Sequence, residues 1–147
     1  MEVSIRDYRK GDYEVVNKLW IVTGMGGAFR GDDEDVINKT IRVGGRLRLM
    51  IEQETEQVIG TSWLSTDHRR LYMHHFGIDP AYQRTGLSKI LLKDSLHIAF
   101  EMGMQVKLEV HSTNKIAQHV YKKYGFENLG DYDVLIMRDV EKINLRQ

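Results

Sequence analysis

The segment that most constrains this fold joins an apolar strand to a long amphipathic helix. Residues 71–78 are mostly apolar, and residues 86–102 repeat apolar side chains at helical spacing, with Gly86 at the junction. The first amides of a helix lack intrahelical partners and lie at the positive end of its dipole, so they stabilise an anion without a lysine. Gly86 lets the backbone approach such a ligand closely. The junction therefore predicts a site for a pyrophosphate.

Composition excludes several classes of function. Lys plus Arg and Asp plus Glu are 21 each, so no overall charge attracts nucleic acid or an anionic membrane. The chain has no cysteine, which excludes disulfides, thiolate zinc sites and a cysteine nucleophile. Its start is charged, and no stretch approaches the ~20 apolar residues of a membrane span. We expect a soluble, cytoplasmic protein of one domain, residues 1–147, that binds neither nucleic acid nor membrane.

The order of expected elements indicates an α/β (α+β) domain. Three strands joined by polar turns predict an antiparallel meander, and the pattern then changes to helix, strand, helix, strand. An acidic run, 32–35, complements the dipole of the second helix. We expect strands at 3–7, 46–52, 57–65, 71–78, 106–111 and 133–137, and helices beginning near residues 12 and 32 and covering 86–102 and 115–124.

A second strand-to-helix unit follows about 40 residues after the junction. In its strand, alternation places Glu109 on the face opposite the apolar side chains. The helix after it has an apolar stripe, and Gly125 stands where a left-handed C-cap residue belongs. The residues of interest in this unit are Asn114, Ala117, Tyr121, Gly125 and Phe126. Two separated segments thus point to one nucleotide-like cofactor.

Taken together, these segments resemble the GNAT superfamily of acyl-CoA-dependent N-acetyltransferases, from Val3 to Met137. The family pattern Gln/Arg-x-x-Gly-x-Gly/Ala stands here as Gln83-Arg84-Thr85-Gly86-Leu87-Ser88, and the second unit follows at the expected distance. Ser88 replaces the usual Gly or Ala, and Arg84 stands where glycine is frequent. The resemblance implies a central, mostly antiparallel, V-splayed mixed sheet flanked by helices.

The resemblance also implies acetyl-CoA as co-substrate, and the spacing of the histidines and carboxylates predicts no metal. Backbone amides of residues 83–88 would hold the pyrophosphate, and the strand edge at 76–78 would pair with the pantetheine amides. The amide region of Ile78 would steady the oxyanion. The expected cofactor-binding residues are Phe76, Gly77, Ile78, Gln83, Arg84, Thr85, Gly86, Leu87, Ser88, Asn114 and Tyr121.

Two residues are expected to carry the chemistry. Tyr121 matches the family tyrosine that protonates the departing thiolate, and a phenol keeps its proton at neutral pH. Tyr124 is its rival on the same stripe. Glu109 lies twelve positions before Tyr121, as the base does in the ribosomal-protein N-terminal alanine acetyltransferases. The alternative is a solvated carboxylate on a strand face.

The acceptor side is less defined by the sequence. In the family, the loop between the first two helices, here 24–33, borders the acceptor. Alternation sends His74 and His75 to opposite faces of their strand, so they are not expected to bind one metal together, although either could relay a proton. The acidic Asp32 is expected to belong to a helix cap.

We therefore expect an enzyme that transfers an acetyl group directly to a primary amine, with a small molecule as the acceptor. One alternative is a protein N-terminal acetyltransferase, which the Glu109 to Tyr121 spacing favours. An alternative of another class is a non-catalytic acyl-CoA-binding or sensing domain. The resemblance and the frequency of two-fold assemblies leave room for a homodimer, with the final strand as its edge.

Overall fold

The computed structural model describes residues 1–143 and 145. The chain divides into two compact units, Met1–His111 and Ser112–Gln147, and each is described by itself.

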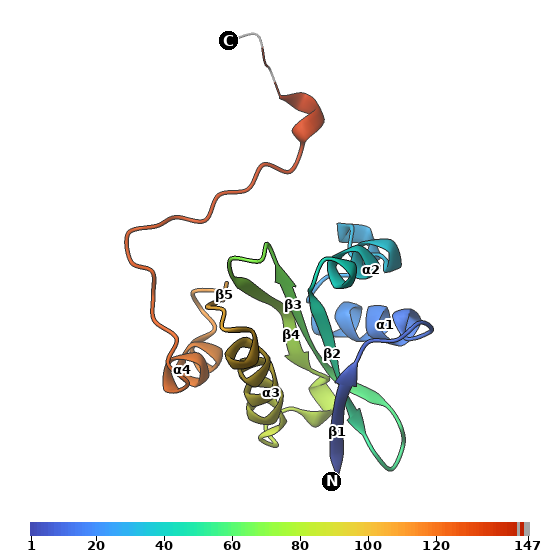
Figure 1. Ribbon diagram of the computed structural model, residues 1–147. Coiled ribbons are helices and arrows are strands. Elements are labelled where there is room, and N and C mark those ends of the chain that lie inside the picture. The colour runs from blue at the N-terminus through green and yellow to red at the C-terminus, as the bar shows by residue number, and fades with distance from the viewer. Residues whose placement is uncertain (144, 146–147) are drawn as a thin grey trace. The chain divides into compact units, whose positions relative to one another are not determined.

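The first unit is built on one five-stranded sheet in the order β1-β2-β3-β4-β5 (Figure 1). Strands β2, β3 and β4 form the expected antiparallel meander, β1 pairs antiparallel to β2, and β5 pairs parallel to β4. The strands are β1 (Val3–Asp7), β2 (Arg46–Glu52), β3 (Val58–Thr66), β4 (Leu71–Ile78) and β5 (Val106–Leu108). The mixed, mostly antiparallel sheet expected from the sequence is confirmed.

The last two strands pair over only part of their length. Leu71, Tyr72 and Met73 face residues 106–108 of β5, whereas β4 continues to Ile78. Strand β5 ends at Leu108, earlier than the expected residue 111. From residue 74 onward, β4 therefore continues beyond its pairing with β5. This partial pairing of the two strands is the splay of the sheet.

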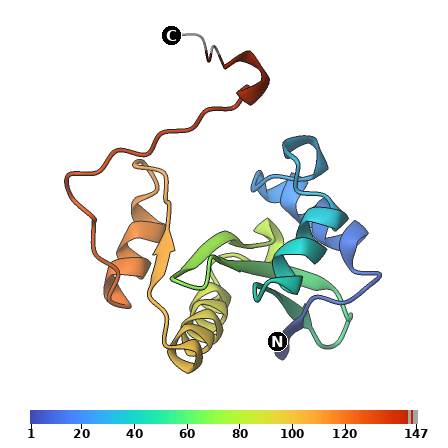
Figure 2. The same ribbon diagram turned by 45° about the horizontal axis from the view of Figure 1, so that its top comes forward.

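Helices cover both faces of this sheet. The helices α1 (Tyr13–Thr23) and α2 (Glu34–Arg42) lie on one face, and α3 (Leu87–Met102) lies on the other (Figures 1 and 2). Two short 3-10 turns, η1 (Ala28–Arg30) and η2 (Pro80–Tyr82), lie in the loops. The loop after α1, which contains η1, reaches β4, and the loop with η2 leads into α3.

The core under α1 is organised by two stacked indoles. The rings of Trp20 and Trp63 lie 5.3 Å apart with planes 8° from parallel, and both side chains are fully buried. Each indole N–H has a partner, since Trp20 donates to Thr61 Oγ1 at 2.9 Å and Trp63 to Thr40 Oγ1 at 3.0 Å. A buried indole with its N–H satisfied contributes its apolar area without a desolvation penalty. Trp63 of this stack lies next to β4, where it pairs with His74 across the sheet.

The second unit contains the helix α4 (Lys115–Lys123) and the 3-10 turn η3 (Val140–Lys142). Asn114 caps α4, and Gly125 follows it in a left-handed conformation, as expected. The strand predicted at 133–137 is wrong, because these residues have no strand pairing among those the structure describes. Their apolar side chains Val134, Leu135, Ile136 and Met137 are exposed. Strand propensity is expressed only where a partner strand supplies the ladder.

Candidate active site

The loop between β4 and α3 has the features of an anion site. Gly86 is the N-cap of α3 and adopts φ 85°, and as a glycine it has no side chain with which to cap the first amides. The side chain of Gln83 turns back and donates to the carbonyl of Ile78 at 2.9 Å. Residues 83–86 are exposed. The first-turn amides of Leu87 and Ser88 have no carbonyl one turn earlier within the helix. The positive end of α3 is thus accessible.

Arg84 explains one departure from the family pattern. Its backbone has φ 63°, a left-handed conformation that most side chains avoid and that glycine adopts readily. The loop therefore keeps the geometry for which the family uses glycine. Thr85 supports it by donating its hydroxyl proton to the carbonyl of Tyr82 at 2.6 Å. The exposed guanidinium of Arg84 adds positive charge at the same place.

The part of β4 beyond its pairing with β5 carries the other predicted cofactor-binding residues. Phe76 packs partly buried against the core cluster that includes Ile78 and Leu87. Gly77 lies under the loop that follows α1, because a Cβ atom there would come within 2.7 Å of the sulfur of Met25. The loop 24–33 thus packs onto β4 beside the strand edge predicted to bind pantetheine.

Glu109 directly follows β5 and is exposed. Its carboxylate acts on the hydroxyl of Tyr72 of β4. Burial, and then the negative charge of Glu109, raise the pKa of the Tyr72 hydroxyl, so this hydroxyl remains a donor at neutral pH. The predicted base therefore lies next to Tyr72 where the pairing of β4 with β5 ends.

Tyr121 and Asn114 belong to the second unit. The Tyr121 ring lies edge-to-face with Phe126, 5.5 Å between centroids, and burial raises the pKa of its hydroxyl to about 12. A phenol with this pKa stays protonated at neutral pH, as a general acid must. The side-chain oxygen of Asn114 accepts from the amide of Ala117 at 3.1 Å. In the structure its identified role is that of an N-cap.

The prediction that His74 and His75 lie on opposite faces is wrong. The register between β3 and β4 shifts after Thr61, so that one β3 residue faces two on β4, and His75 has φ 45°. Such a bulge breaks the two-residue alternation of a strand. Both rings therefore point to the α1 face, where His74 Nδ1 lies 2.8 Å from His75 Nδ1. Both also pack against Trp63.

Two further residues complete this cluster and were not singled out as site residues from the sequence. Asp32 Oδ2 lies 2.9 Å from His75 Nε2, and Ser65 Oγ lies 3.1 Å from His74 Nε2. The expected capping role of the acidic run belongs to Asp33, whose side chain accepts from the amide of Val36. Asp32 stands one residue before that cap and points to β4 instead. Only the tertiary fold brings these four side chains together.

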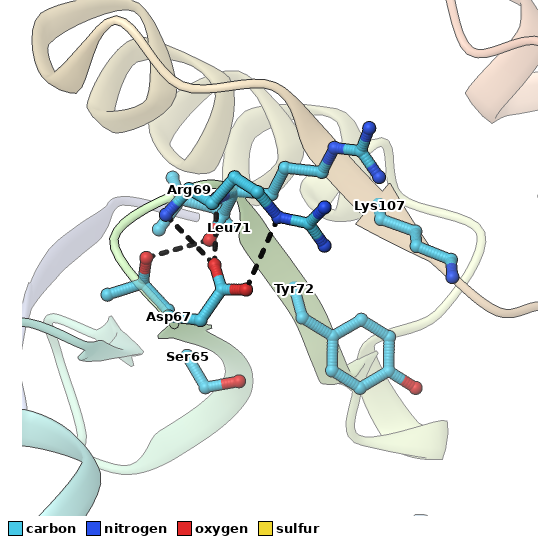
Figure 3. Close-up of a pocket in the computed structure, with 8 residues that line it drawn as sticks. Ser65, Asp67, Arg69, Leu71, Tyr72 and Lys107 are labelled. Carbon is cyan, nitrogen blue, oxygen red and sulfur yellow. Dashed lines mark hydrogen bonds and ion pairs between the residues drawn. The ribbon is translucent and has the colours of Figure 1, made fainter.

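A pocket of about 370 Å³ lies at the start of β4 (Figure 3). Ser65 and Tyr72, which pair across β3 and β4, both line it. The basic side chains of Arg69, Arg70 and Lys107 surround it, and Asp67 holds the turn by accepting from the amides of the two arginines. The pocket thus contacts both Tyr72, which is next to Glu109, and Ser65, which is the last residue of the histidine cluster.

Among the residues that the structure describes, no group of three His, Asp or Glu side chains could hold a metal ion. Within the same residues, no helix is long and apolar enough to cross a membrane.

Comparison with known proteins agrees with this geometry. The model of the acetyltransferase (GNAT) family matches residues 15–126, which is more than half of the chain. The protein belongs to the GNAT acetyltransferase family. GNAT acetyltransferases use acetyl-CoA as the acyl donor.

One curated protein resembles part of this GNAT protein in sequence. The N-alpha-acetyltransferase RimI of Mycobacterium tuberculosis (strain ATCC 25618 / H37Rv) is 40% identical over 58 residues, which are 40% of this chain and 35% of that protein. The match thus spans about a third of the length of this curated relative.

Solved structures confirm the fold. A GNAT-family acetyltransferase from Staphylococcus aureus Mu50 has a TM-score of 0.76 and 19% identity, over 90% of each chain. A GNAT-family acetyltransferase from Elizabethkingia anophelis, solved with acetyl-CoA bound, has a TM-score of 0.63 and 18% identity, over 85% of this chain and 76% of its own.

Proposed function

We propose that this GNAT protein transfers the acetyl group of acetyl-CoA directly to a primary amine. The observation that carries the proposal is the exposed N-terminus of α3, which the loop after β4 leads into. Gly86 at the N-cap and the left-handed Arg84 shape this loop for an anionic group. The cofactor would be held by backbone amides of residues 83–88, with residues 76–78 pairing to its pantetheine arm.

Direct transfer is favoured over an acyl-enzyme intermediate because the chain has no cysteine. The neutral amine attacks the thioester carbonyl, and the amide region of Ile78 stabilises the oxyanion. Glu109 is the proposed base for the amine nitrogen, and Tyr121 protonates the departing thiolate of CoA. The raised pKa of Tyr121, about 12, supports its role as the acid.

We assign the acceptor to the class of primary amines, with small molecules first. A pocket of about 370 Å³ beside Glu109's neighbour Tyr72 is large enough for a small amine. A protein N-terminus is the second candidate, since the RimI relative is named as an N-alpha-acetyltransferase. The single-domain organisation, the homodimer and the cytoplasmic location remain predictions.

An acceptor panel tests this proposal. Purified protein is incubated with acetyl-CoA and, separately, polyamines, amino acids, aminoglycosides and short peptides with free N-termini, and products are identified by mass spectrometry. We expect one class to be N-acetylated, which separates small amines from peptides. Binding of acetyl-CoA without acetylation of any amine would support the non-catalytic acyl-CoA-sensing alternative instead.

A further inference from the structure

Four side chains form a continuous hydrogen-bonded row across the α1 face of β4. In order they are Asp32, His75, His74 and Ser65, with successive distances of 2.9, 2.8 and 3.1 Å. All three distances lie within the range of ordinary hydrogen bonds. The residues come from three separate segments, and the β4 bulge is what aligns the two imidazoles.

The direction of these hydrogen bonds follows from the carboxylate. An ionised Asp32 only accepts, so His75 Nε2 donates to it and His75 Nδ1 is left as an acceptor. His74 must then donate from Nδ1, which leaves its Nε2 to accept from the Ser65 hydroxyl. Both imidazoles thus donate and accept, while Ser65 donates at one end and Asp32 accepts at the other. Such a row can pass a proton from Ser65 to Asp32 by a concerted shift of its hydrogen bonds.

The surroundings of the row keep the His74 ring neutral. Burial, and then the neighbouring His75, lower the pKa of His74 to about 3, against an opposing effect of Asp32. The rings are enclosed by Trp20 from α1 and Trp63 from β3, and the Tyr72 ring stacks on His74 at 5.0 Å. The titratable and charged groups that face the two imidazoles are thus Asp32 from the loop and Tyr72 from β4, with Glu109 behind Tyr72. A neutral His74 conducts a proton but does not retain one.

The two ends of the row face different surroundings, one the pocket and the other the solvent. Ser65 is half-buried and lines the pocket at the start of β4 (Figure 3). At the other end, the His75 side chain is 12% exposed and that of Asp32 is 21% exposed. A proton that enters from the pocket can therefore leave to solvent at Asp32.

We propose that the row Asp32–His75–His74–Ser65 is a proton relay that deprotonates the ammonium form of the acceptor before it attacks acetyl-CoA. The inference rests on the proposed acetyl transfer and adds to it a route for the first of two protons. An amine arrives largely protonated at neutral pH, because model amines have pKa values of about 7.7 to 10.4. It must lose one proton to become a nucleophile and a second after attack.

The proton balance is as follows. The ammonium gives its proton to Ser65 Oγ as the Ser65 proton moves to His74 Nε2. The His74 Nδ1 proton moves to His75 Nδ1, the His75 Nε2 proton moves to Asp32, and Asp32 releases one proton to solvent. After attack, Glu109 takes the second proton and releases it to solvent, and Tyr121 regains from solvent the proton that it gives to the thiolate. One proton is released overall for each ammonium acetylated.

The test compares kcat/KM for the amine against pH in the full chain, using the acceptor that the wild-type protein acetylates. Asp32→Asn keeps a side-chain oxygen that accepts from His75 but cannot take its proton, and His74→Gln keeps hydrogen bonding without conduction. We expect each to lower kcat/KM about 10- to 100-fold at pH 7, the lower range for a positioned proton acceptor, with KM for acetyl-CoA unchanged. With an α-amine acceptor the deficit should vanish above pH ~9, where the amine is already neutral.

Matched controls separate conduction from structure. His97→Gln and Asp35→Asn alter exposed residues of the same types outside the row and should change neither rate nor pH profile. Glu109→Gln should show a deficit that persists at high pH, because the second proton is lost after attack. If His74→Gln does not fold, Asp32→Asn and Ser65→Ala carry the test from the two ends of the row.

Proton inventories in H₂O/D₂O mixtures give a second readout. A curved inventory in the wild-type protein that becomes linear in Asp32→Asn supports the relay, since several protons then move together. A pH-independent deficit, or variants as fast as wild type at pH 7, overturns the relay while leaving acetyl transfer established. A wild-type protein that acetylates no amine overturns the proposed function, and the relay with it.

Discussion

Burial, and then the carboxylate of Glu109 just after β5, raise the pKa of the Tyr72 hydroxyl on β4. Tyr72 also stacks on His74 and pairs across the strands with Ser65. One tyrosine thus borders both the predicted base and the proposed relay. This position lets two protons leave one amine by separate routes.

Replacing the predicted base should slow chemistry without weakening cofactor binding. Glu109→Gln keeps a partner for Tyr72 but removes the proton acceptor, so we expect kcat to fall about 100-fold, within the usual range for general bases. The KM for acetyl-CoA should stay unchanged. Glu101→Gln, at an exposed position of α3, is the control. Equal kcat values for Glu109→Gln and wild type would show that Glu109 is a solvated carboxylate and not the base.

The two tyrosines of α4's stripe can be separated directly. Tyr121→Phe removes the predicted acid and should lower kcat about 100-fold, whereas acetyl-CoA affinity measured by calorimetry should not change. Tyr124→Phe is the matched variant, since Tyr124 is the rival at the end of the same helix. A large loss of kcat in Tyr124→Phe with normal Tyr121→Phe would reverse the assignment.

The N-terminus of α3 offers a test of the cofactor site. Gly86 and Gly103 bound this helix, both are left-handed, and a Cβ at either meets nothing within 4 Å. Each change to Ala should cost about 1 kcal/mol of stability, because left-handed backbone is strained for alanine. Only Gly86→Ala should also weaken acetyl-CoA binding, by about tenfold, since alanine disturbs the amides there. Equal affinities in the two variants would argue against this anion site.

His74 makes the folding free energy depend on pH. Its pKa is about 3 in the folded protein and near 6.5 when unfolded, so the unfolded chain binds the extra proton below pH 6.5. The stability associated with the neutral ring is fully present above that pH and is lost as pH falls. Between pH 6.5 and 4.5, denaturant titrations should show wild type losing up to about 1.4 kcal/mol per pH unit more than His74→Gln. Parallel stability curves would show that His74 titrates normally.

Much of this fold could be predicted from local sequence. The meander and α3 follow from apolar periodicity, and the glycines at the ends of α3 mark its limits. The anion-binding loop was also predictable, because its function depends on backbone amides and on Gly86. In these segments, residues that are consecutive in the sequence form the predicted binding site.

The acceptor side could not be predicted in the same way. A bulge at His75 depends on how β4 packs against β3 and the indoles, so strict alternation gave the wrong faces for His74 and His75. Asp32 looked like part of a helix cap because its contact with His75 spans 43 positions. The doublet of histidines was the visible signal, and its partners required the tertiary fold.

The central claim is acetyl-CoA-dependent transfer to an amine, and release of free CoA thiol tests it most directly. Because the protein has no cysteine, a thiol reagent reports CoA with little background. We predict that acetyl-CoA binds in calorimetry and that thiol appears only when an acceptor amine is added, at a rate that Tyr121→Phe reduces. Failure of acetyl-CoA to bind, or thiol release that is the same with and without any amine, would contradict the account.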